Sequence, residues 1–136
     1  MAVISKEPAK EAKRILIVDD ETAVLFAYGR LTRFLDVITD VCETYEEAIE
    51  LINKHRYEFV ITDIKLDQSE AKGGLDILDY MSNHHFKTEG VVMTGYSNER
   101  NKKRAVDLGV SYYFEKPLSP DVIMKILKSR GIRCND

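Results

Sequence analysis

The stretch ILIVDDE, residues 15–21, places four apolar residues directly before three acidic ones. Three of the four are β-branched, and a short run of this kind is typical of a strand that is buried on both faces of a sheet. FVIT at residues 59–62 and VVMT at residues 91–94 repeat the pattern. Two more polar runs, at residues 36–42 and 111–115, complete five predicted strands and indicate the two edges of the sheet.

Helical patterns separate the five predicted strands. The first helix has apolar residues at helical spacing, Tyr28 and Phe34 among them, and Thr44 followed by Glu47 is typical of the start of the second helix. The third helix is expected to start near Leu75. Strict alternation of strands and helices predicts right-handed βαβ units, and therefore an α/β fold with a parallel sheet covered by helices on both faces.

The fourth predicted helix, at residues 98–108, differs from the others in composition. Its sequence is almost wholly polar, with Ala105, Val106 and Leu108 as its main apolar anchors. Because helices in globular proteins are stabilised mainly by burying an apolar face, we expect this helix to pack weakly.

Length and charge exclude several classes of protein. The chain has 136 residues, which fits one domain, and 20 Lys and Arg against 23 Asp and Glu give a net charge of -3. This weak charge argues against direct binding of nucleic acid. The sequence has no apolar run long enough for a membrane span and no signal-peptide pattern, so we expect a cytoplasmic protein.

The chain divides into three parts. Residues 1–13 are polar and contain Pro8, which indicates a flexible leader. The domain is expected at residues 14–130, and residues 131–136 form a C-terminal tail. No internal repeat or second domain is indicated.

Reactive side chains follow four of the five predicted strands. Asp19 and Asp20 end the first strand, Asp63 the third, Thr94 the fourth and Lys116 the fifth. In a parallel sheet these strand ends share one edge. Carboxylates that lie so close together raise one another's pKa unless a cation lies between them. Oxygen ligands favour a hard ion such as Mg²⁺ or Mn²⁺. Lys116 and Thr94 would then contact an anion that binds there.

Simpler interpretations remain open for two of the acidic residues. Asp20 has the side chain of a helix cap and can serve the following helix in that way. Glu21 is interpreted as a first-turn helix residue favoured by the helix dipole, and not as a ligand.

Four stretches of the chain, in order, resemble the receiver domain of two-component response regulators. They are ILIVDDE at 15–21, FVITDIKL at 59–66, VVMTGYS at 91–97 and YYFEKPL at 112–118. The resemblance covers about residues 14–130. It implies a flavodoxin-like, doubly wound fold with a five-stranded parallel sheet in the order 2-1-3-4-5 and helices on both faces.

The resemblance also implies roles for individual residues. Asp63 is implied as the phosphoacceptor and as one of the metal ligands, Asp20 as a direct Mg²⁺ ligand and Asp19 as a nearby ligand that acts partly through water. The other implied roles are metal ligation by the backbone carbonyl of Lys65, pairing of Lys116 with the phosphoryl group, and switch functions for the Thr94 hydroxyl and the Tyr113 ring.

A receiver is a phosphorelay acceptor and not a metabolic enzyme. By this resemblance, a sensor histidine kinase or a histidine phosphotransfer protein would donate the phosphoryl group, and the chain would catalyse its own phosphorylation and a slow dephosphorylation. A downstream partner would bind the fourth helix, fifth strand and fifth helix, and a phosphorylation-dependent homodimer is a further possibility. The Lys116–Pro117 bond is expected to be cis.

One segment departs from the family's pattern. Residues 66–74, LDQSEAKGG, lack the proline that commonly follows the acceptor and form a loop a few residues longer. The departure leaves the acceptor chemistry untouched and leaves the shape and partner specificity of this loop open.

Two other functions compete with the receiver. Mg²⁺-dependent phosphatases with an aspartyl nucleophile have an Asp-x-Asp motif after the strand. The corresponding residues here, Asp63-Ile64-Lys65, lack the second acid. A flavin carrier of the same fold would need a hydroxyl-rich phosphate loop after the first strand, where the acidic VDDET would repel the phosphate. Multiple turnover of a phosphomonoester would favour the phosphatase, and a yellow protein the flavin carrier.

Overall fold

The computed structural model describes residues 12–66, 72–84 and 86–134. Residues 1–11 of the predicted leader and residues 67–71 of the atypical loop lie outside this description. None of the helices in the described ranges is long and apolar enough to span a bilayer.

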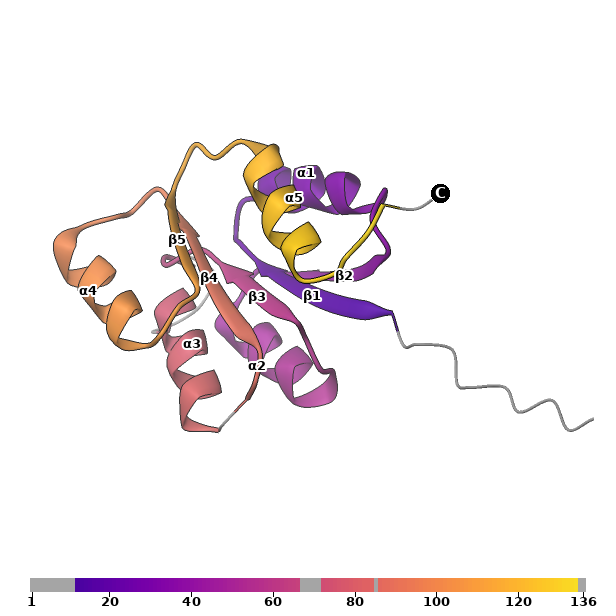
Figure 1. Cartoon of the computed structure of the whole chain (residues 1–136). Coiled ribbons are helices and arrows are strands. Elements are labelled where there is room, and N and C mark those ends of the chain that lie inside the picture. Colours follow the sequence, from indigo (N-terminus) through magenta and orange to yellow (C-terminus); the bar gives the residue numbers. More distant parts are fainter. Residues whose placement is uncertain (1–11, 67–71, 85, 135–136) are drawn as a thin grey trace, which may run out of the picture.

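Five strands form one parallel sheet in the order β2-β1-β3-β4-β5, as predicted (Figure 1). Each short apolar run identified in the sequence lies in a central strand, and the two more polar runs lie at the edges. The strands are β1 (Lys13–Val18), β2 (Val37–Cys42), β3 (Phe59–Thr62), β4 (Glu89–Thr94) and β5 (Tyr112–Glu115).

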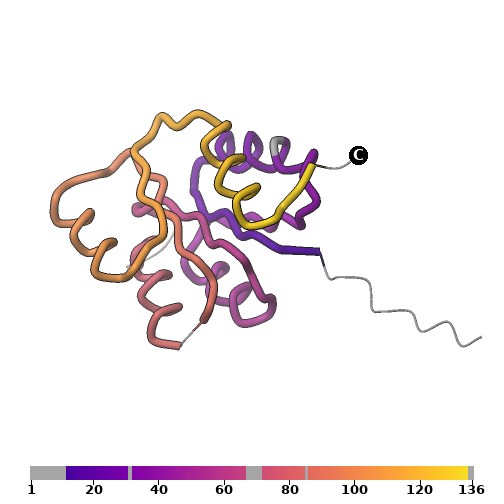
Figure 2. The backbone as a smooth tube through the Cα atoms, in the orientation of Figure 1, coloured from indigo at the N-terminus to yellow at the C-terminus, as the bar shows by residue number. Residues whose placement is uncertain are grey.

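Five helices alternate with the strands and cover both faces of the sheet. Figure 1 shows α1 and α5 on one face and α2 and α3 on the other, with α4 beside β5. The tube in Figure 2 follows the same alternation along the chain. The helices are α1 (Thr22–Thr32), α2 (Tyr45–Lys54), α3 (Gly74–Asn83), α4 (Glu99–Asp107) and α5 (Pro120–Ser129).

Side chains of β1 alternate between two apolar cores. Leu16 and Val18 pack in the core beneath α2 and α3, and Ile15 and Ile17 pack in the core beneath α1 and α5. All four are fully buried. This alternation explains why the whole run ILIV is apolar, because a central strand between two helix layers has no solvent-exposed face.

The start of α2 forms as the sequence predicts. The Thr44 hydroxyl accepts a hydrogen bond from the backbone N–H of Glu47, with 3.1 Å between the nitrogen and the oxygen. This bond satisfies one of the N–H groups that the first turn of a helix leaves without a partner in the helix itself.

Two apolar side chains lie elsewhere than predicted. Phe34 is 69% exposed, because it lies beyond the end of α1 and its neighbour Leu35 enters the core in its place. Val106 is 66% exposed and does not anchor α4. Successive residues of a helix point about 100° apart, so the burial of Ala105 directs Val106 away from the sheet.

The C-terminal residues pack onto the domain. Ile132 is buried in the core beneath α1 and α5, and Cys134 forms an antiparallel bridge with Leu35. The Lys13 ammonium donates a hydrogen bond to the backbone carbonyl of Arg130. The start of β1 therefore lies against the end of α5.

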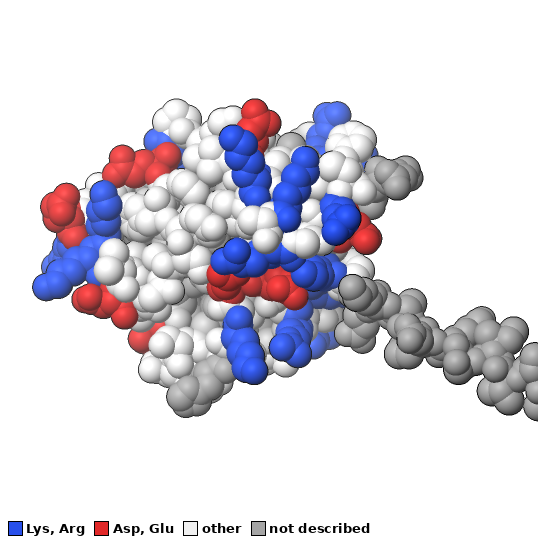
Figure 3. Space-filling view, in the orientation of Figure 1, with Lys and Arg blue, Asp and Glu red and all other residues white. Residues whose placement is uncertain are grey.

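Figure 3 shows how charged side chains are distributed on the face seen in Figure 1. Basic side chains gather around a central acidic patch. One pair is well defined: Arg130 donates two hydrogen bonds to the Glu89 carboxylate, at 2.6 and 2.7 Å. This contact lowers the pKa of Glu89 below its ordinary value and ties the end of α5 to the start of β4.

Candidate functional site

Three carboxylates converge at the carboxyl edge of the sheet. Asp19 and Asp20 follow β1 and Asp63 follows β3, and these strands are neighbours. One oxygen from each carboxylate lies within 4.8 Å of the others. Asp19 and Asp63 are almost wholly buried, at 0% and 1% exposed. The predicted convergence of the three acids is confirmed.

Lys116 bridges two of these acids. Its ammonium donates to Asp19 at 2.7 Å and to Asp63 at 2.9 Å. Burial by itself lowers the pKa of Lys116, but the hydrogen bonds to the two carboxylates outweigh this effect and raise the pKa above its ordinary value. Lys116 is therefore a fixed positive charge at the centre of the site. The Lys116–Pro117 bond is cis, as predicted.

Burial also changes the acidity of Asp19. Its removal from solvent raises the pKa of Asp19, and the hydrogen bonds from Lys116 and from the backbone N–H of Glu21 oppose this rise. The net result is a pKa of Asp19 above its ordinary value, because the effect of burial is larger than that of these hydrogen bonds.

Glu21 takes a different position from the one its sequence neighbours suggest. It is the N-cap of α1, without a side-chain capping hydrogen bond, and is not a residue of the first turn. Its carboxylate lies 3.5 Å from the Lys116 ammonium and is 59% exposed. The interpretation as a helix residue is wrong by one position, and the structure adds Glu21 to the rim of the site.

The fit of the site to a divalent cation can be judged from its charges. Three carboxylates face one lysine, and two of the carboxylates are removed from solvent. Their ligand atoms are all oxygen, as Mg²⁺ and Mn²⁺ prefer. The three acids therefore fit a hard divalent ion.

Two glycines, Gly73 and Gly74, lie in close contact with the backbone of Asp63 and Ile64. A Cβ atom at Gly74 would lie 1.7 Å from the Asp63 carbonyl oxygen, and one at Gly73 would lie 2.3 Å from that of Ile64. The Gly74 N–H donates to the Ile64 carbonyl at 2.8 Å. The Asp63 carboxylate also accepts from the N–H of Ile64 at 2.7 Å. Only glycine fits such an approach, so the GG pair at the start of α3 was the sequence signal for this contact.

Thr94 lies at the end of β4, on the same edge of the sheet. It is fully buried, and its hydroxyl accepts from the N–H of Tyr96 at 3.0 Å. In the next strand, the Tyr113 hydroxyl hydrogen-bonds the Ser97 hydroxyl at 2.8 Å. The loop after β4 thus contacts both residues predicted to form the switch, and the switch itself stays a prediction.

Lys65 and Tyr96 meet above this edge. The Lys65 ammonium lies 4.8 Å from the centre of the Tyr96 ring, within the range of a cation–π contact, and Tyr96 is half exposed. Lys65 lies two residues after Asp63 and Tyr96 two residues after Thr94, and the fold brings the two side chains into contact. Metal ligation by the Lys65 carbonyl stays a prediction.

A hollow of about 710 Å³ adjoins the site between the start of α1 and the loops after β4 and β5. Small or apolar side chains, among them Ala23, Val24, Ala27 and Leu118, form most of its wall, and Lys116 lies at its border. The hollow gives a bulky group room to approach Lys116 and the acids beside it.

Comparison with known proteins gives the same family that the sequence motifs resemble. Residues 15–128 match the family described as the response regulator receiver domain. The acid tolerance regulatory protein ActR of Rhizobium meliloti is 30% identical over 87% of this chain and 59% of its own length. The photosynthetic apparatus regulatory protein RegA of Rhodobacter capsulatus is 24% identical over 88% of this chain and 63% of its own length. The chain thus spans about three-fifths of the length of these relatives.

Solved structures agree with the sequence comparison. A CheY-like response regulator receiver domain protein from Methanospirillum hungatei has a TM-score of 0.79 and 26% identity, over 87% of this chain and 92% of that one. The similarity therefore covers almost the whole fold described above.

Proposed function

This chain belongs to the family of response regulator receiver domains, and we propose that it accepts a phosphoryl group on Asp63 from a histidine kinase or a histidine phosphotransfer protein. The observation that carries the proposal is the bridge from Lys116 to Asp63 and Asp19 within a cluster of three acids. A nucleophilic carboxylate beside a fixed cation is the arrangement that phosphoryl transfer needs.

In the proposed transfer, an Asp63 carboxylate oxygen attacks the phosphorus of a phosphohistidine. A new O–P bond forms while the P–N bond breaks, and its electron pair returns to the imidazole of the donor. Lys116 stabilises the negative charge on the phosphoryl oxygens, and Ile64 N–H orients the carboxylate. Asp19, Asp20, Asp63 and the Lys65 carbonyl would hold Mg²⁺ or Mn²⁺, which would neutralise further charge on the transferring group.

The phosphorylated state would then change the loop after β4. An acyl phosphate adds nearly two negative charges beside Thr94, whose hydroxyl proton is available to donate to it. Tyr96 N–H is bonded to Thr94, and Ser97 is bonded to Tyr113, so a shift of Thr94 reaches the Tyr113 ring through adjacent residues. We infer that the surface of α4, β5 and α5 changes for a downstream partner, or for a second copy of the chain, in this way.

The direct test is phosphorylation by acetyl phosphate with Mg²⁺, followed by intact-mass measurement. We expect one phosphoryl group that is labile to hydroxylamine in the wild type, and none in Asp63→Asn. Asp107→Asn, which makes the same chemical change at an exposed position of α4, is the matched control and should be phosphorylated normally.

Equal phosphorylation of Asp63→Asn would refute the assignment of the acceptor. Repeated turnover of a phosphomonoester by the wild type would favour the function of a phosphatase over that of a phosphoacceptor. Lack of phosphorylation of both the wild type and Asp107→Asn would refute the proposed function itself.

A further inference from the structure

Asp76, in the first turn of α3, contacts two parts of the molecule that the proposed function requires to communicate. One of its carboxylate oxygens accepts a hydrogen bond from Gly73 N–H at 2.8 Å. The other accepts from the Arg104 guanidinium of α4, at 2.9 Å. Residues 76 and 104 are 28 positions apart in the chain, so this contact depends wholly on the tertiary fold.

The contact between Asp76 and Gly73 lies next to the backbone of the proposed phosphoacceptor, Asp63. Gly73 and Gly74 lie against the carbonyl groups of Ile64 and Asp63, and Gly74 N–H donates to Ile64. By holding Gly73, Asp76 fixes the turn that supports the acceptor's backbone. Misplacement of a reacting group by about 1 Å can slow a reaction by about a hundredfold, so this support matters for transfer.

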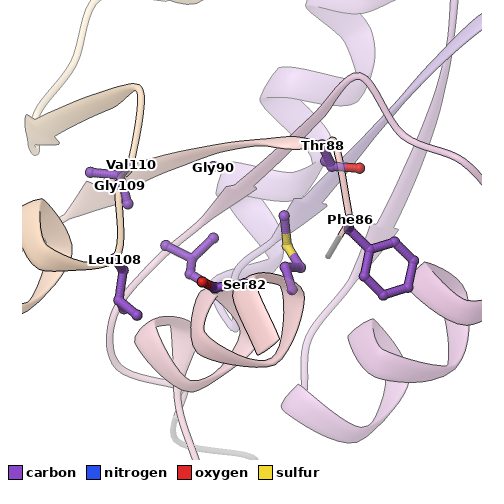
Figure 4. A pocket seen from close by; sticks show the side chains of 9 residues that line it. Ser82, Phe86, Thr88, Gly90, Leu108, Gly109 and Val110 are labelled. Carbon is purple, nitrogen blue, oxygen red and sulfur yellow. The ribbon is translucent and has the colours of Figure 1, made fainter. Parts of the chain in front are cut away.

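The second contact is one of few that hold α4. Among the described residues of this helix only Ala105 is buried. Beyond its C-terminal end, a hollow of about 390 Å³ separates α3 from the turn that leads into β5. Figure 4 shows this space, with Leu108, Gly109 and Val110 on one side and Ser82 of α3 on the other. The end of α4 therefore borders a hollow, and in the described ranges its apolar contacts are limited to Ala105 and to Leu108 and Val110, which are only partly buried against the core.

The ion pair between Asp76 and Arg104 is partly exposed, at 31% and 45% of the side chains. Exposed pairs contribute little when both side chains must be ordered to form them. Here the Asp76 carboxylate is already held by Gly73, so mainly the arginine must be ordered. The contact thus costs less conformational entropy than an ordinary surface pair.

We propose that Asp76 is a positioning residue that joins the backbone of the phosphoacceptor to α4 through Arg104. This inference rests on the proposed phosphorylation of Asp63 and adds a route by which the acceptor and the α4 surface influence each other. Coupling between two sites is reciprocal. A partner that binds α4 and alters the Arg104 contact therefore changes the support of Asp63, and phosphorylation changes the docking of α4.

Three substitutions separate the two contacts of Asp76. Asp76→Ala removes both contacts, Asp76→Asn keeps an oxygen for Gly73 N–H but loses the ion pair, and Arg104→Gln loses the ion pair alone. Lys103→Gln is the matched control, because it removes the same charge from α4 and the structure gives Lys103 no partner within the described ranges. Circular dichroism and urea titration establish that each variant is folded before it is compared.

Two measurements read the two contacts separately. The rate of phosphorylation by acetyl phosphate and Mg²⁺ should fall about tenfold in Asp76→Ala. It should fall by only about two- to threefold in Asp76→Asn and Arg104→Gln, which lose the partly exposed ion pair alone, and should stay at the wild-type level in Lys103→Gln. Hydrogen exchange of α4 amides in the unphosphorylated protein should be about two- to fivefold faster in Asp76→Asn and Arg104→Gln than in Lys103→Gln. The effect of phosphorylation on α4 exchange should shrink in the same two variants.

Two results would overturn the inference: an Asp76→Ala variant that is folded and phosphorylated at the wild-type rate, or an Arg104→Gln variant whose α4 exchange equals that of Lys103→Gln. The rescue of the rate by asparagine but not by alanine distinguishes positioning from a general loss of stability. A wild-type protein that takes up no phosphoryl group would instead refute the proposed function, while the exchange data without phosphate would still decide the Arg104 contact.

Discussion

α4 and α5 flank the same edge strand, β5, yet they are attached to the molecule in different ways. α5 buries Ile123, Ile126 and Leu127 in the core that it shares with α1. In the described chain, α4 buries Ala105 alone and relies on polar contacts at its ends. Helices with few buried apolar contacts open at low free energy, so the two sides of the proposed partner surface should differ in local stability.

The largest expected effect is on stability and contrasts one core position in α5 with one exposed position in α4. Leu127→Ala should lower the free energy of unfolding by about 2–5 kcal/mol, because Leu127 is fully buried. Val106→Ala should change it by less than about 0.5 kcal/mol, because Val106 is 66% exposed. Urea unfolding measures both. Similar losses in the two variants would contradict the difference in attachment.

The second prediction concerns the loop that leads into α4. Tyr96→Ala should speed loss of the phosphoryl group about tenfold, equivalent to about 1.4 kcal/mol, if the ring and Lys65 keep water from the side opposite the aspartyl oxygen. Lys65→Ala should have a smaller effect in the same direction. Dephosphorylation is followed after removal of acetyl phosphate, with Val106→Ala as the control. Unchanged rates in both loop variants would show that Tyr96 serves only the outer surface.

A third prediction tests whether α4 opens without the rest of the domain. The Asn98 side chain caps α4 by accepting from Asn101 N–H at 2.8 Å. Asn98→Ala should destabilise the helix by about 1 kcal/mol. We expect faster hydrogen exchange in α4 and little change in the urea midpoint. Thr44→Ala removes the equivalent cap of α2, a helix with two buried residues, and should lower the midpoint. A midpoint that fell equally in both variants would show that α4 unfolds only with the whole domain.

The smallest expected effect is pH-dependent and lies at the end of α5. The contact with Arg130 lowers the pKa of Glu89 from its ordinary value of 4.5. A carboxylate with a lowered pKa stabilises the folded state above its unfolded pKa, and this contribution is lost as pH falls through the folded pKa. The wild type should therefore exceed Glu89→Gln slightly in stability at neutral pH, and the difference should vanish in acid. A difference that grew below pH 4.5 would contradict this sign.

Much of the fold and the site could be predicted because the deciding signals are local in the sequence. The run ILIV is apolar throughout, and the acids and the lysine come directly after their strands. Parallel topology then brings the strand ends together without further information. The same reasoning places Asp19, Asp63 and Lys116 at one edge of the sheet. The direct hydrogen bonds from Lys116 to the two acids come from the structure.

The errors and omissions arose where local pattern does not determine rotation or distance. Apolar spacing could not tell that Val106 faces solvent, because that depends on which side of α4 meets the sheet. The pair of Asp76 with Arg104 and that of Lys65 with Tyr96 join residues from separate loops and helices. Such contacts form only when the helices and loops have packed together, so no local sequence motif predicts them.

The contact between Lys13 and Arg130 has a practical consequence for protein engineering. It brings the two ends of the described domain together at the start of the strands, while the three acids lie at the opposite edge of the sheet (Figures 1 and 2). A domain whose ends meet can be inserted into a surface loop of a host protein without being stretched. Inserted there, this domain would present its acidic edge outward. The host protein would then carry a domain for which phosphorylation at Asp63 is proposed.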